Sequence, residues 1–333
     1  MIVCGCADRG AIIALPAPDQ KQEQEQQEPQ EQEPAHEWDA NRGKIVTPSG
    51  AGWTSKTIDD GVTYYTYTST GSTKLRVYAV DLDLSKTQYD VKLVYTRPDR
   101  KYPSQVFAET PGAVAVMNAN YEVTSIYIRV DGSEQYCIPN TIINGTSVPN
   151  WKSEAAFVSD RHRNIKLDYF GSINKGKTIQ QQRDYYSSLP NSTSRDIISS
   201  APMLIDDFEP VGLDFCDYTL TDAQVKKLDS EDLNSHQRNR NPRSAVALTE
   251  NGHFIMLIVD GRSTTSVGMS ARELTNFFVK YFNPQYALNM DGGGSTTMLY
   301  WNGTEPVMVN RHDPARKSRR NNGTNMGLYI QRK

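Results

Sequence analysis

Residues 286–299, with the sequence YALNMDGGGSTTML, combine side-chain types that could bind and react with a polar ligand. A short apolar run typical of a buried strand ends at one carboxylate, Asp291, and a polar loop follows it. The loop consists of Gly292, Gly293, Gly294, Ser295 and Thr296. Glycines allow positive φ and leave backbone N–H groups uncovered, so this loop suits an anion or a sugar hydroxyl. A sharp structural turn in which Asp291 caps its own loop is the competing interpretation.

Three other apolar runs also end in polar residues. One run ends near Asn118, a second has its polar residue at its beginning, Arg243, and a third ends at Asp260, which Gly261 and Arg262 follow. Asn289 lies just before the glycine loop itself. Strands that end side by side bring such residues into one pocket, so the sequence predicts a shared site. Two structural alternatives stay open: residues 260–262 form a turn with a surface salt bridge, and Arg243 pairs with Asp260 or Asp291.

Elements that could position these residues are mostly strands. Alternating or apolar stretches predict strands at 62–68, 74–82, 89–95, 113–118, 126–130, 155–158, 244–249, 253–259 and 286–290. Hairpin turns are expected at 250–252 and 302–303. The early strands follow one another without helical patterns between them, which favours antiparallel pairing. The expected fold class is α+β, with strand-rich mixed or antiparallel sheets and a few packed helices.

Two helices are predicted from their N-terminal signals. Ser270 and Glu273 form a capping box, and apolar residues follow at helical spacing up to Tyr281. Thr221 and Gln224 indicate a second, more polar helix over roughly 222–234 on the surface. Residues 175–200 are polar and irregular, and we expect a long lid-like excursion there.

Length and charge limit the classes of function. The chain has 333 residues, is 37% hydrophobic, and carries a formal net charge of -3 with a pI near 6.0, which argues against bulk nucleic-acid binding. It has no apolar run of about 18 residues, so no membrane-spanning segment is expected. The expected organisation is an N-terminal stub and tether over 1–43, a strand-rich region over 44–110 that is a subdomain or the first strands of the same sheet, and a main domain over 111–333.

The N-terminus has an unusual composition. Residues 19–34 are rich in Gln and Glu and nearly free of hydrophobic residues, so a disordered tether is expected. Residues 3–6, VCGC, resemble the end of a bacterial lipoprotein signal, with Cys6 as the lipidated residue. This indicates a location in the bacterial cell envelope, periplasmic or surface-exposed. Cys137 and Cys216 form a disulfide or remain two buried thiols, and no zinc-binding spacing is present.

Seven short motifs follow one another in a characteristic order. They are residues 118–121 (NANY), 201–204 (APML), 241–245 (NPRSA), 259–262 (VDGR), 266–270 (SVGMS), 289–298 (NMDGGGSTTM) and 309–311 (VNR). In this order the set resembles the phosphodiester glycosidase family, over roughly residues 112–330. Asn241 stands where that family often has histidine.

The resemblance implies hydrolysis of the glycosidic bond of a sugar-1-phosphodiester, or a related glycoside, in cell-surface or exopolysaccharide glycans. Asp291, or Asp260 as second choice, would then serve as nucleophile or base at the anomeric carbon. Arg243 and Arg262 would hold the phosphodiester, together with the glycine loop.

Further contacts would come from Asn118 and Asn289, which would bind sugar hydroxyls, and from Arg311. Arg311 opens a basic loop that lines the phosphate side or is simply a solvated charge run. No cofactor or metal is required. Two alternatives stay open: a non-catalytic glycan-binding protein, and a divalent-metal hydrolase that uses Asp260, Asp291 and Asn118 as ligands.

Overall fold

The computed structural model describes residues 40–95, 103–119, 121, 125–135, 150–169, 179–229, 232–310 and 326–333. The chain divides after Ala35, and the unit His36–Lys333 contains all of these residues. The N-terminal tether, the motif around Cys6, Cys137 and Arg311 lie outside the described residues.

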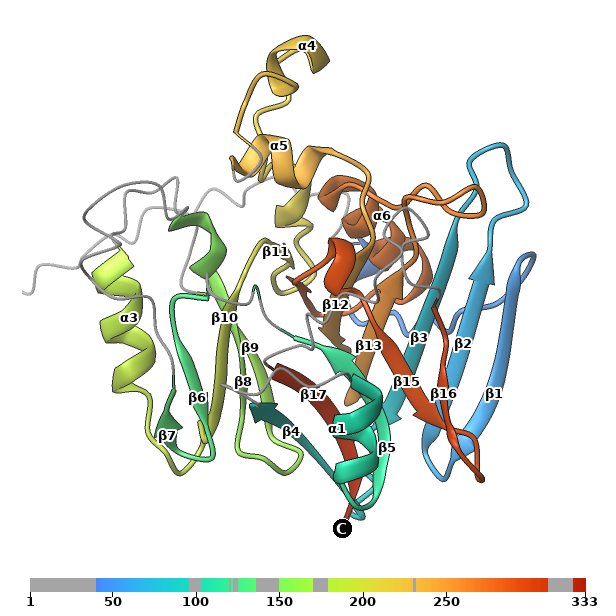
Figure 1. Ribbon diagram of the computed structural model, residues 1–333, viewed down its shortest axis with the longest axis vertical. Coiled ribbons are helices and arrows are strands. Elements are labelled where there is room, and N and C mark those ends of the chain that lie inside the picture. The colour runs from blue at the N-terminus through green and yellow to red at the C-terminus, as the bar shows by residue number, and fades with distance from the viewer. Residues whose placement is uncertain are drawn as a thin grey trace, which may run out of the picture. The chain divides into compact units, whose positions relative to one another are not determined.

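The largest sheet has seven strands, ordered β1-β2-β3-β13-β12-β14-β11, and every pairing in it is antiparallel (Figure 1). Its strands are β1 (Trp53–Asp59), β2 (Val62–Thr68), β3 (Arg76–Asp83), β11 (Met203–Ile205), β12 (Arg243–Leu248), β13 (His253–Val259) and β14 (Tyr286–Met290). β3 pairs with β13 from Val77 to Asp83, so the region 44–110 contributes strands to the same sheet as the later chain.

Two five-stranded sheets complete the strand framework. One, ordered β7-β6-β10-β8-β9, contains β6 (Ile128–Val130), β7 (Ser133–Glu134), β8 (Ala155–Ser159), β9 (Ile165–Tyr169) and β10 (Asp196–Ser200). The other, ordered β16-β15-β5-β17-β4, contains β4 (Tyr89–Tyr95), β5 (Ala113–Asn118), β15 (Met298–Trp301), β16 (Pro306–Met308) and β17 (Met326–Arg332). All their pairings are antiparallel, which confirms the predicted α+β class.

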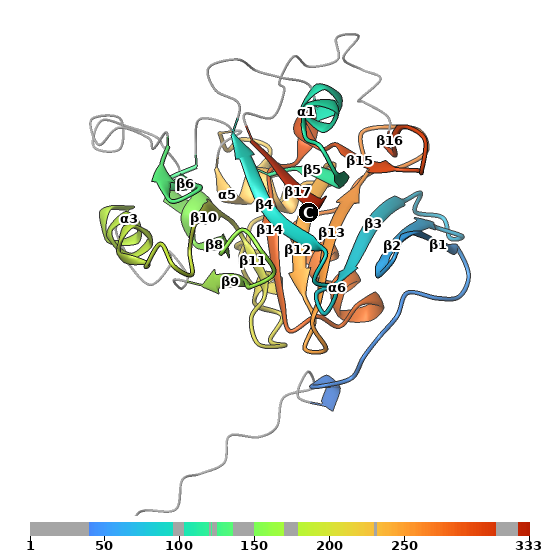
Figure 2. The same ribbon diagram turned by 90° about the horizontal axis from the view of Figure 1, so that it is seen from below.

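The two faces of the seven-stranded sheet are both apolar. Val246 and Leu288 belong to the largest apolar cluster, which they share with Leu93 of β4 and Phe157 of β8. Figure 2 shows β4 and β17 crossing in front of β12 and β14. Alternate residues such as Ala245 point to the opposite face. The sheet is therefore buried on both sides at β12, β13 and β14, which explains why these three strands are nearly continuous apolar runs.

Helix α6 (Ala271–Tyr281) covers that opposite face, where Leu274 and Phe278 pack among the sheet residues. The predicted capping box is confirmed: the Ser270 hydroxyl accepts from the Glu273 N–H, and the Glu273 carboxylate accepts from the Ser270 N–H. Further helical segments among the described residues are α1 (Pro103–Glu109), α3 (Ile179–Ser188), α4 (Asp222–Val225), α5 (Leu233–Arg238) and the short 3-10 turns η3 (Asn150–Ser153), η5 (Val211–Leu213) and η6 (Gly293–Ser295).

Two predictions about secondary structure are wrong. The single helix over 222–234 is instead α4, which keeps the predicted Thr221 capping box, and the separate α5, capped by Asp232. The excursion over 175–200 contains α3 and the fully buried strand β10. The sequence of α3 is polar overall, so it does not show which residues face inward. In the structure Tyr186 and Gln182 are buried.

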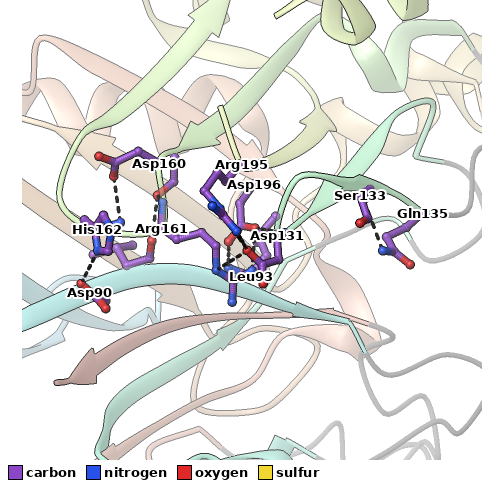
Figure 3. A network of polar contacts seen from close by, with 12 residues as sticks. Asp90, Leu93, Asp131, Ser133, Gln135, Asp160, Arg161, His162, Arg195 and Asp196 are labelled. Atoms are coloured by element: carbon purple, nitrogen blue, oxygen red, sulfur yellow. Dashed lines mark hydrogen bonds and ion pairs between the residues drawn. The ribbon is translucent and has the colours of Figure 1, made fainter. Parts of the chain in front are cut away.

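A buried carboxylate ties the two five-stranded sheets together (Figure 3). Asp196 on β10 accepts hydrogen bonds from the Leu93 N–H of β4 at 2.7 Å, from the Asp131 N–H at 2.7 Å, and from Arg161 Nη1 at 2.9 Å. Burial raises the pKa of Asp196, while these donors and the Arg161 charge oppose the rise. Because the carboxylate bridges separate sheets, this network fixes β4 against β10.

Candidate active site at the strand ends

The beginning of β12 and the ends of β13 and β14 carry polar residues and lie side by side at one end of the seven-stranded sheet. Arg243 at the start of β12 pairs with Val259 at the end of β13, and Ser244 pairs with Met290 at the end of β14. Antiparallel neighbours place the start of one strand beside the ends of the next two. This end of the sheet lies below α5 (Figure 1). We call the residues gathered there the strand-end site: Tyr121, Lys152, His236, Asn241, Arg243, Arg262, Asn289, Asp291 and the loop 292–296.

The glycine loop lies directly against the backbone of the β12 entry. The Gly293 N–H donates to the Pro242 carbonyl at 2.8 Å, and a Cβ at Gly292 would lie 2.5 Å from the same oxygen. Gly293 has φ +62°, and the Arg262 guanidinium lies next to it. The loop then forms η6, which contains Gly294 and Ser295. Only glycine fits at position 292, because any side chain would overlap backbone atoms.

Asn118 joins the ends of three segments. Its Nδ2 donates to the Asp291 carbonyl at 2.7 Å, and its Oδ1 accepts from Ser244 Oγ at 2.8 Å and from the Thr297 N–H at 3.0 Å. The side chain is fully buried. These bonds all go to protein atoms, so the geometry favours a positioning role in place of the sugar contact expected from sequence.

Arg243 is 1% exposed and binds backbone oxygens at the end of α5. Its guanidinium donates to the carbonyls of His236 at 3.1 Å and Asn239 at 2.9 Å, to Gln237 Oε1 at 2.7 Å, and to the Met269 carbonyl at 2.9 Å. A cation at a helix C-terminus also complements the helix dipole. Arg243 therefore holds α5 and residue 269 onto the sheet through hydrogen bonds to protein atoms.

Asn289 and Tyr121 form a buried polar pair beside Asp291. Asn289 Nδ2 donates to Tyr121 Oη at 2.8 Å and to the Ala201 carbonyl at 2.9 Å. Within the described part of the chain, Asn289 Oδ1 has no hydrogen-bond partner although it is buried. Burial raises the pKa of Tyr121, and the negative charge of Asp291 adds to the rise. The charge of Asp291 thus acts on the same Tyr121 hydroxyl that accepts from Asn289.

Arg262 bends back over the glycine loop. It adopts a positive φ of 55°, and its Nε and Nη2 both donate to Asn241 Oδ1, at 3.1 and 2.8 Å. Asn241 is held in turn by reciprocal backbone hydrogen bonds with Met269. Because Arg262 is exposed, its guanidinium presents a cation at the surface of the strand-end site.

Asp260 faces the other side of the sheet. Its Oδ2 accepts from Tyr78 Oη at 3.4 Å, and its charge contributes to the raised pKa of Tyr64. Since β13 side chains alternate, Asp260 and its neighbour Val259, which pairs with Arg243, point in opposite directions. The structure does not bring the carboxylate of Asp260 beside the guanidinium of Arg243.

Two residues that sequence reasoning missed complete the site. The Lys152 ammonium is buried and lies 5.0 Å from the centre of the Tyr121 ring and 5.3 Å from that of Trp151. The His236 ring lies 5.2 Å from Trp151 and 5.8 Å from Tyr121. Burial, followed by the charges of Arg243, Lys152 and Arg262, lowers the pKa of His236 to about 3. The site therefore combines three cations with a neutral imidazole, an arrangement that favours an anionic ligand.

The end of the loop contains one more unpaired group. Thr296 Oγ1 is buried and has no hydrogen-bond partner among the described residues. Asn310 holds this part of the loop through its bonds to the Thr296 carbonyl at 2.8 Å and the Met298 N–H at 3.2 Å. The next residue, Arg311, and the basic loop it opens are outside the described ranges, so their expected role stays a prediction.

Other features of the described residues bear on the remaining expectations. They contain no group of three or more His, Cys, Asp or Glu side chains arranged to hold a metal ion. None of their helices has the length and apolarity needed to span a membrane. Cys216 is a free, buried thiol. Cavities of about 590, 280 and 100 Å³ lie at other places in the molecule, and none of their lining residues belongs to the strand-end site.

The fold and the strand-end site thus define a strand-rich α+β protein with a cation-lined site beside a carboxylate and a glycine loop. The model of the phosphodiester glycosidase family matches residues 112–329, so the chain belongs to this family. Membership indicates a glycosidase whose substrate is a carbohydrate.

One solved structure supports the fold, and two others show a weaker similarity. The catalytic domain of zebrafish N-acetylglucosamine-1-phosphodiester alpha-N-acetylglucosaminidase, auto-inhibited by its pro-peptide, is 16% identical, with 87% of each chain covered and a TM-score of 0.53. A hypothetical protein from Synechocystis is 12% identical over 86% of this chain and 64% of its own, with a TM-score of 0.48. A putative exported protein from Burkholderia pseudomallei is 13% identical over 77% and 74%, with a TM-score of 0.49. No curated protein matches the chain.

Proposed function

We propose that the protein hydrolyses the glycosidic bond of a sugar-1-phosphodiester in a cell-surface or exopolysaccharide glycan. The observation that carries this proposal is the pairing of opposite charges at the strand ends. The Lys152 ammonium lies over the Tyr121 ring, and the charges of Lys152, Arg243 and Arg262 add to burial in keeping His236 neutral, while the negative charge of Asp291 acts on Tyr121. A sugar-1-phosphodiester needs this combination, because its phosphate is anionic and its anomeric carbon becomes positive in the transition state.

The cationic side would bind the phosphate. Lys152 and Arg262 are the cations we assign to the phosphate oxygens, with N–H and hydroxyl donors from Gly294, Ser295 and Thr296. The unpaired Thr296 hydroxyl supports this assignment, since a buried donor without a partner is costly unless a ligand completes it. Arg243 is a positioning residue, because its guanidinium holds α5 and thereby His236.

The acidic side would act at the anomeric carbon. Asp291 serves as nucleophile, or as the base that removes a proton from water, and the bond between the anomeric carbon and the phosphate oxygen breaks. Water supplies the hydroxyl group of the released sugar, which keeps one of its protons, and the phosphomonoester leaves with the bonding electron pair. The other proton of water, taken up by Asp291, then passes to the phosphomonoester or to solvent. Phosphate is a good leaving group, so charge stabilisation contributes more than general-acid help. The second-choice carboxylate, Asp260, accepts a hydrogen bond from Tyr78, whereas the Asp291 charge acts on Tyr121 within the strand-end site, which favours Asp291 for this role.

His236 would respond to the bound anion. Burial, followed by the charges of its neighbouring cations, keeps the imidazole neutral. A phosphate anion placed among the same cations would offset their effect and raise the pKa of His236 toward its ordinary value. A protonated His236 can then donate its proton to the departing phosphate. Asn241, which stands where the family often has histidine, has no such proton to give.

Turnover of a panel of chromogenic sugar-1-phosphodiesters tests the proposal. Asp291→Asn should abolish turnover and leave the melting temperature close to that of wild type, whereas the exposed control Asp214→Asn should keep wild-type rates. If the wild type turns over no diester in the panel but binds glycans, the protein is a glycan-binding member of the family. Loss of turnover in a chelator, restored by calcium or magnesium, would instead support a metal-dependent hydrolase and contradict our proposal that no cofactor is required.

We also propose that the protein acts in the bacterial cell envelope through a lipid anchor at Cys6. The support is the sequence VCGC followed by the polar tether over 19–34. Metabolic labelling with a palmitate analogue tests this directly. Wild type should be labelled and should fractionate with membranes, and Cys6→Ala should be unlabelled. Labelling that persists in Cys6→Ala would contradict the anchor.

A further inference from the structure

A groove lies at the far end of β5 from the strand-end site. β5 runs from Ala113, which lines the groove, to Asn118, which contacts the Asp291 backbone, a span of about 17 Å at strand geometry. The groove has a volume of about 590 Å³, which is within the range of small-ligand sites. Its walls come from the ends of β1 and β17, from the segment after α1, and from the turn between β15 and β16. Figure 2 shows α1 beside β15 and β16.

One wall of the groove is a supported aromatic surface. Trp301, the last residue of β15, is 38% exposed although its ring is large and apolar. Phe107 of α1, which lines the same groove, stacks with it, with the two rings inclined by 13° and their centroids 6.5 Å apart. Phe107 is itself buried, so the Trp301 ring is held in place before any ligand arrives. A fixed, flat apolar face costs little conformational entropy when it binds another flat apolar face.

The opposite part of the lining is polar but electrically balanced. Asp59 at the end of β1 forms an ion pair with Arg332 at the end of β17. Hydrogen bonding to Asp59 raises the pKa of Arg332, and its side chain is 54% exposed. A guanidinium has five N–H donors and a carboxylate has about four acceptor positions, so this pair can bind further hydroxyl groups without separating. A charged ligand would have to compete with the ion pair, whereas a neutral one would not.

We propose that this groove is a second saccharide-binding site, specific for neutral pyranose units and separate from the strand-end site. A pyranose ring has an apolar C–H face that fits the Trp301 ring and a rim of hydroxyls that fits Asp59 and Arg332. The groove and the strand-end site lie at opposite ends of β5, so one glycan chain can be held at the groove while another part of it, or another chain, is cleaved. Binding at the groove requires no turnover, so it stands independently of the proposed hydrolase activity.

Calorimetric titration with four neutral oligosaccharides, namely maltohexaose, cellohexaose, chitohexaose and mannohexaose, tests the proposal. At least one should bind the wild type, and Trp301→Ala should weaken that binding by at least tenfold. Asp59→Asn should weaken it by a smaller factor, since it removes the charged acceptor but keeps the aromatic surface. The matched control is Met308→Ala, because Met308 is 37% exposed on the adjacent β16 and does not line the groove. Thermal melting checks that each variant is folded.

Two further measurements separate this site from the proposed active site and from other occupants. Asp291→Asn should bind the same oligosaccharide with wild-type affinity, and Trp301→Ala should turn over a small diester at the wild-type rate. Absence of binding by all four oligosaccharides, or equal binding by wild type and Trp301→Ala, overturns the proposal. A dimer seen by sedimentation in the wild type and lost in Trp301→Ala also overturns it, because the groove would then bind a second copy of the chain.

Discussion

Replacing Glu154 by glutamine should change how the stability of the protein depends on pH. Glu154 is 2% exposed; its Oε2 accepts from the Met203 N–H at 3.2 Å, and its Oε1 shares a hydrogen bond with Tyr169 Oη, also at 3.2 Å. Burial raises the pKa of Glu154 to about 8 from an ordinary value of 4.5, against the lowering effect of these two bonds. The carboxyl group is therefore neutral at pH 7, and an amide can make the same two hydrogen bonds.

The sign and size of the effect follow from proton linkage. Because the folded pKa lies above the unfolded one, the contribution of Glu154 to stability is fully present below pH 4.5 and is lost as the pH rises toward 8. With these two pKa values, wild type should lose about 3 kcal/mol of unfolding free energy through this one group between pH 4.5 and pH 7. Glutamine does not titrate, so Glu154→Gln should match wild type near pH 4.5 and exceed its stability by about that amount at pH 7.

Urea unfolding of both proteins at half-unit steps from pH 4.5 to 8 measures this difference. Subtracting the variant from wild type removes the contributions of all other titrating groups. Glu305→Gln, at an exposed position, is the matched control and should give no pH-dependent difference. A constant difference between wild type and Glu154→Gln over the whole range would refute the reasoning, and so would a less stable variant at pH 8.

Three more predictions concern the strand-end site. Asn118→Ala leaves the Thr297 N–H and the Asp291 carbonyl without partners and should cost about 2–4 kcal/mol in urea unfolding; unchanged stability with weaker substrate binding would instead assign Asn118 to the sugar. Gly292→Ala forces the loop away from Pro242 and should reduce turnover at least tenfold. Gly71→Ala is the control and should have no effect, because a Cβ at position 71 has no atom within 4 Å. Equal turnover rates for wild type and Gly292→Ala would contradict the assigned loop geometry. The pKa of His236 in the folded protein lies below its unfolded value of 6.5, so the free energy of unfolding should fall by about 1.4 kcal/mol per pH unit as the pH drops below 6.5. His236→Gln should lack this slope. Identical acid unfolding profiles of the two proteins would disprove the prediction.

Local signals were enough to predict the principal elements. The alternation of β3 and the apolar runs of β13 and β14 identify strands because side chains of a strand point to opposite faces. The capping boxes at Thr221 and Ser270 were also predictable, because each is made by residues three apart. The prediction failed where local pattern and burial disagree. Helix α3 is polar overall yet buries Tyr186, and β10 is buried because other strands flank it.

Some residues of the candidate site could likewise be predicted from the sequence, and others could not. The sequence marked Asp291, the glycine loop and Arg262, since their residue types and spacing indicate a site without any tertiary contact. It also marked Arg243 but not the direction of its side chain, and burial under α5 turns that guanidinium toward backbone carbonyls. Lys152 and His236 gave no signal, because each is an ordinary residue in a short helical segment of the sequence.

The sequence by itself determined the family, the strand-rich class and the position of the glycine loop, because these depend on residue order and on contacts within a few residues. Tertiary structure alone decided the charge and orientation of the groups in the site. The neutral state of His236 depends on burial together with the charges of Arg243, Lys152 and Arg262, of which Lys152 comes from a segment far away in the sequence. The separation of Asp260 from Arg243 depends on which face of the sheet each strand position meets. Such properties arise from distances in space, which the order of residues does not specify.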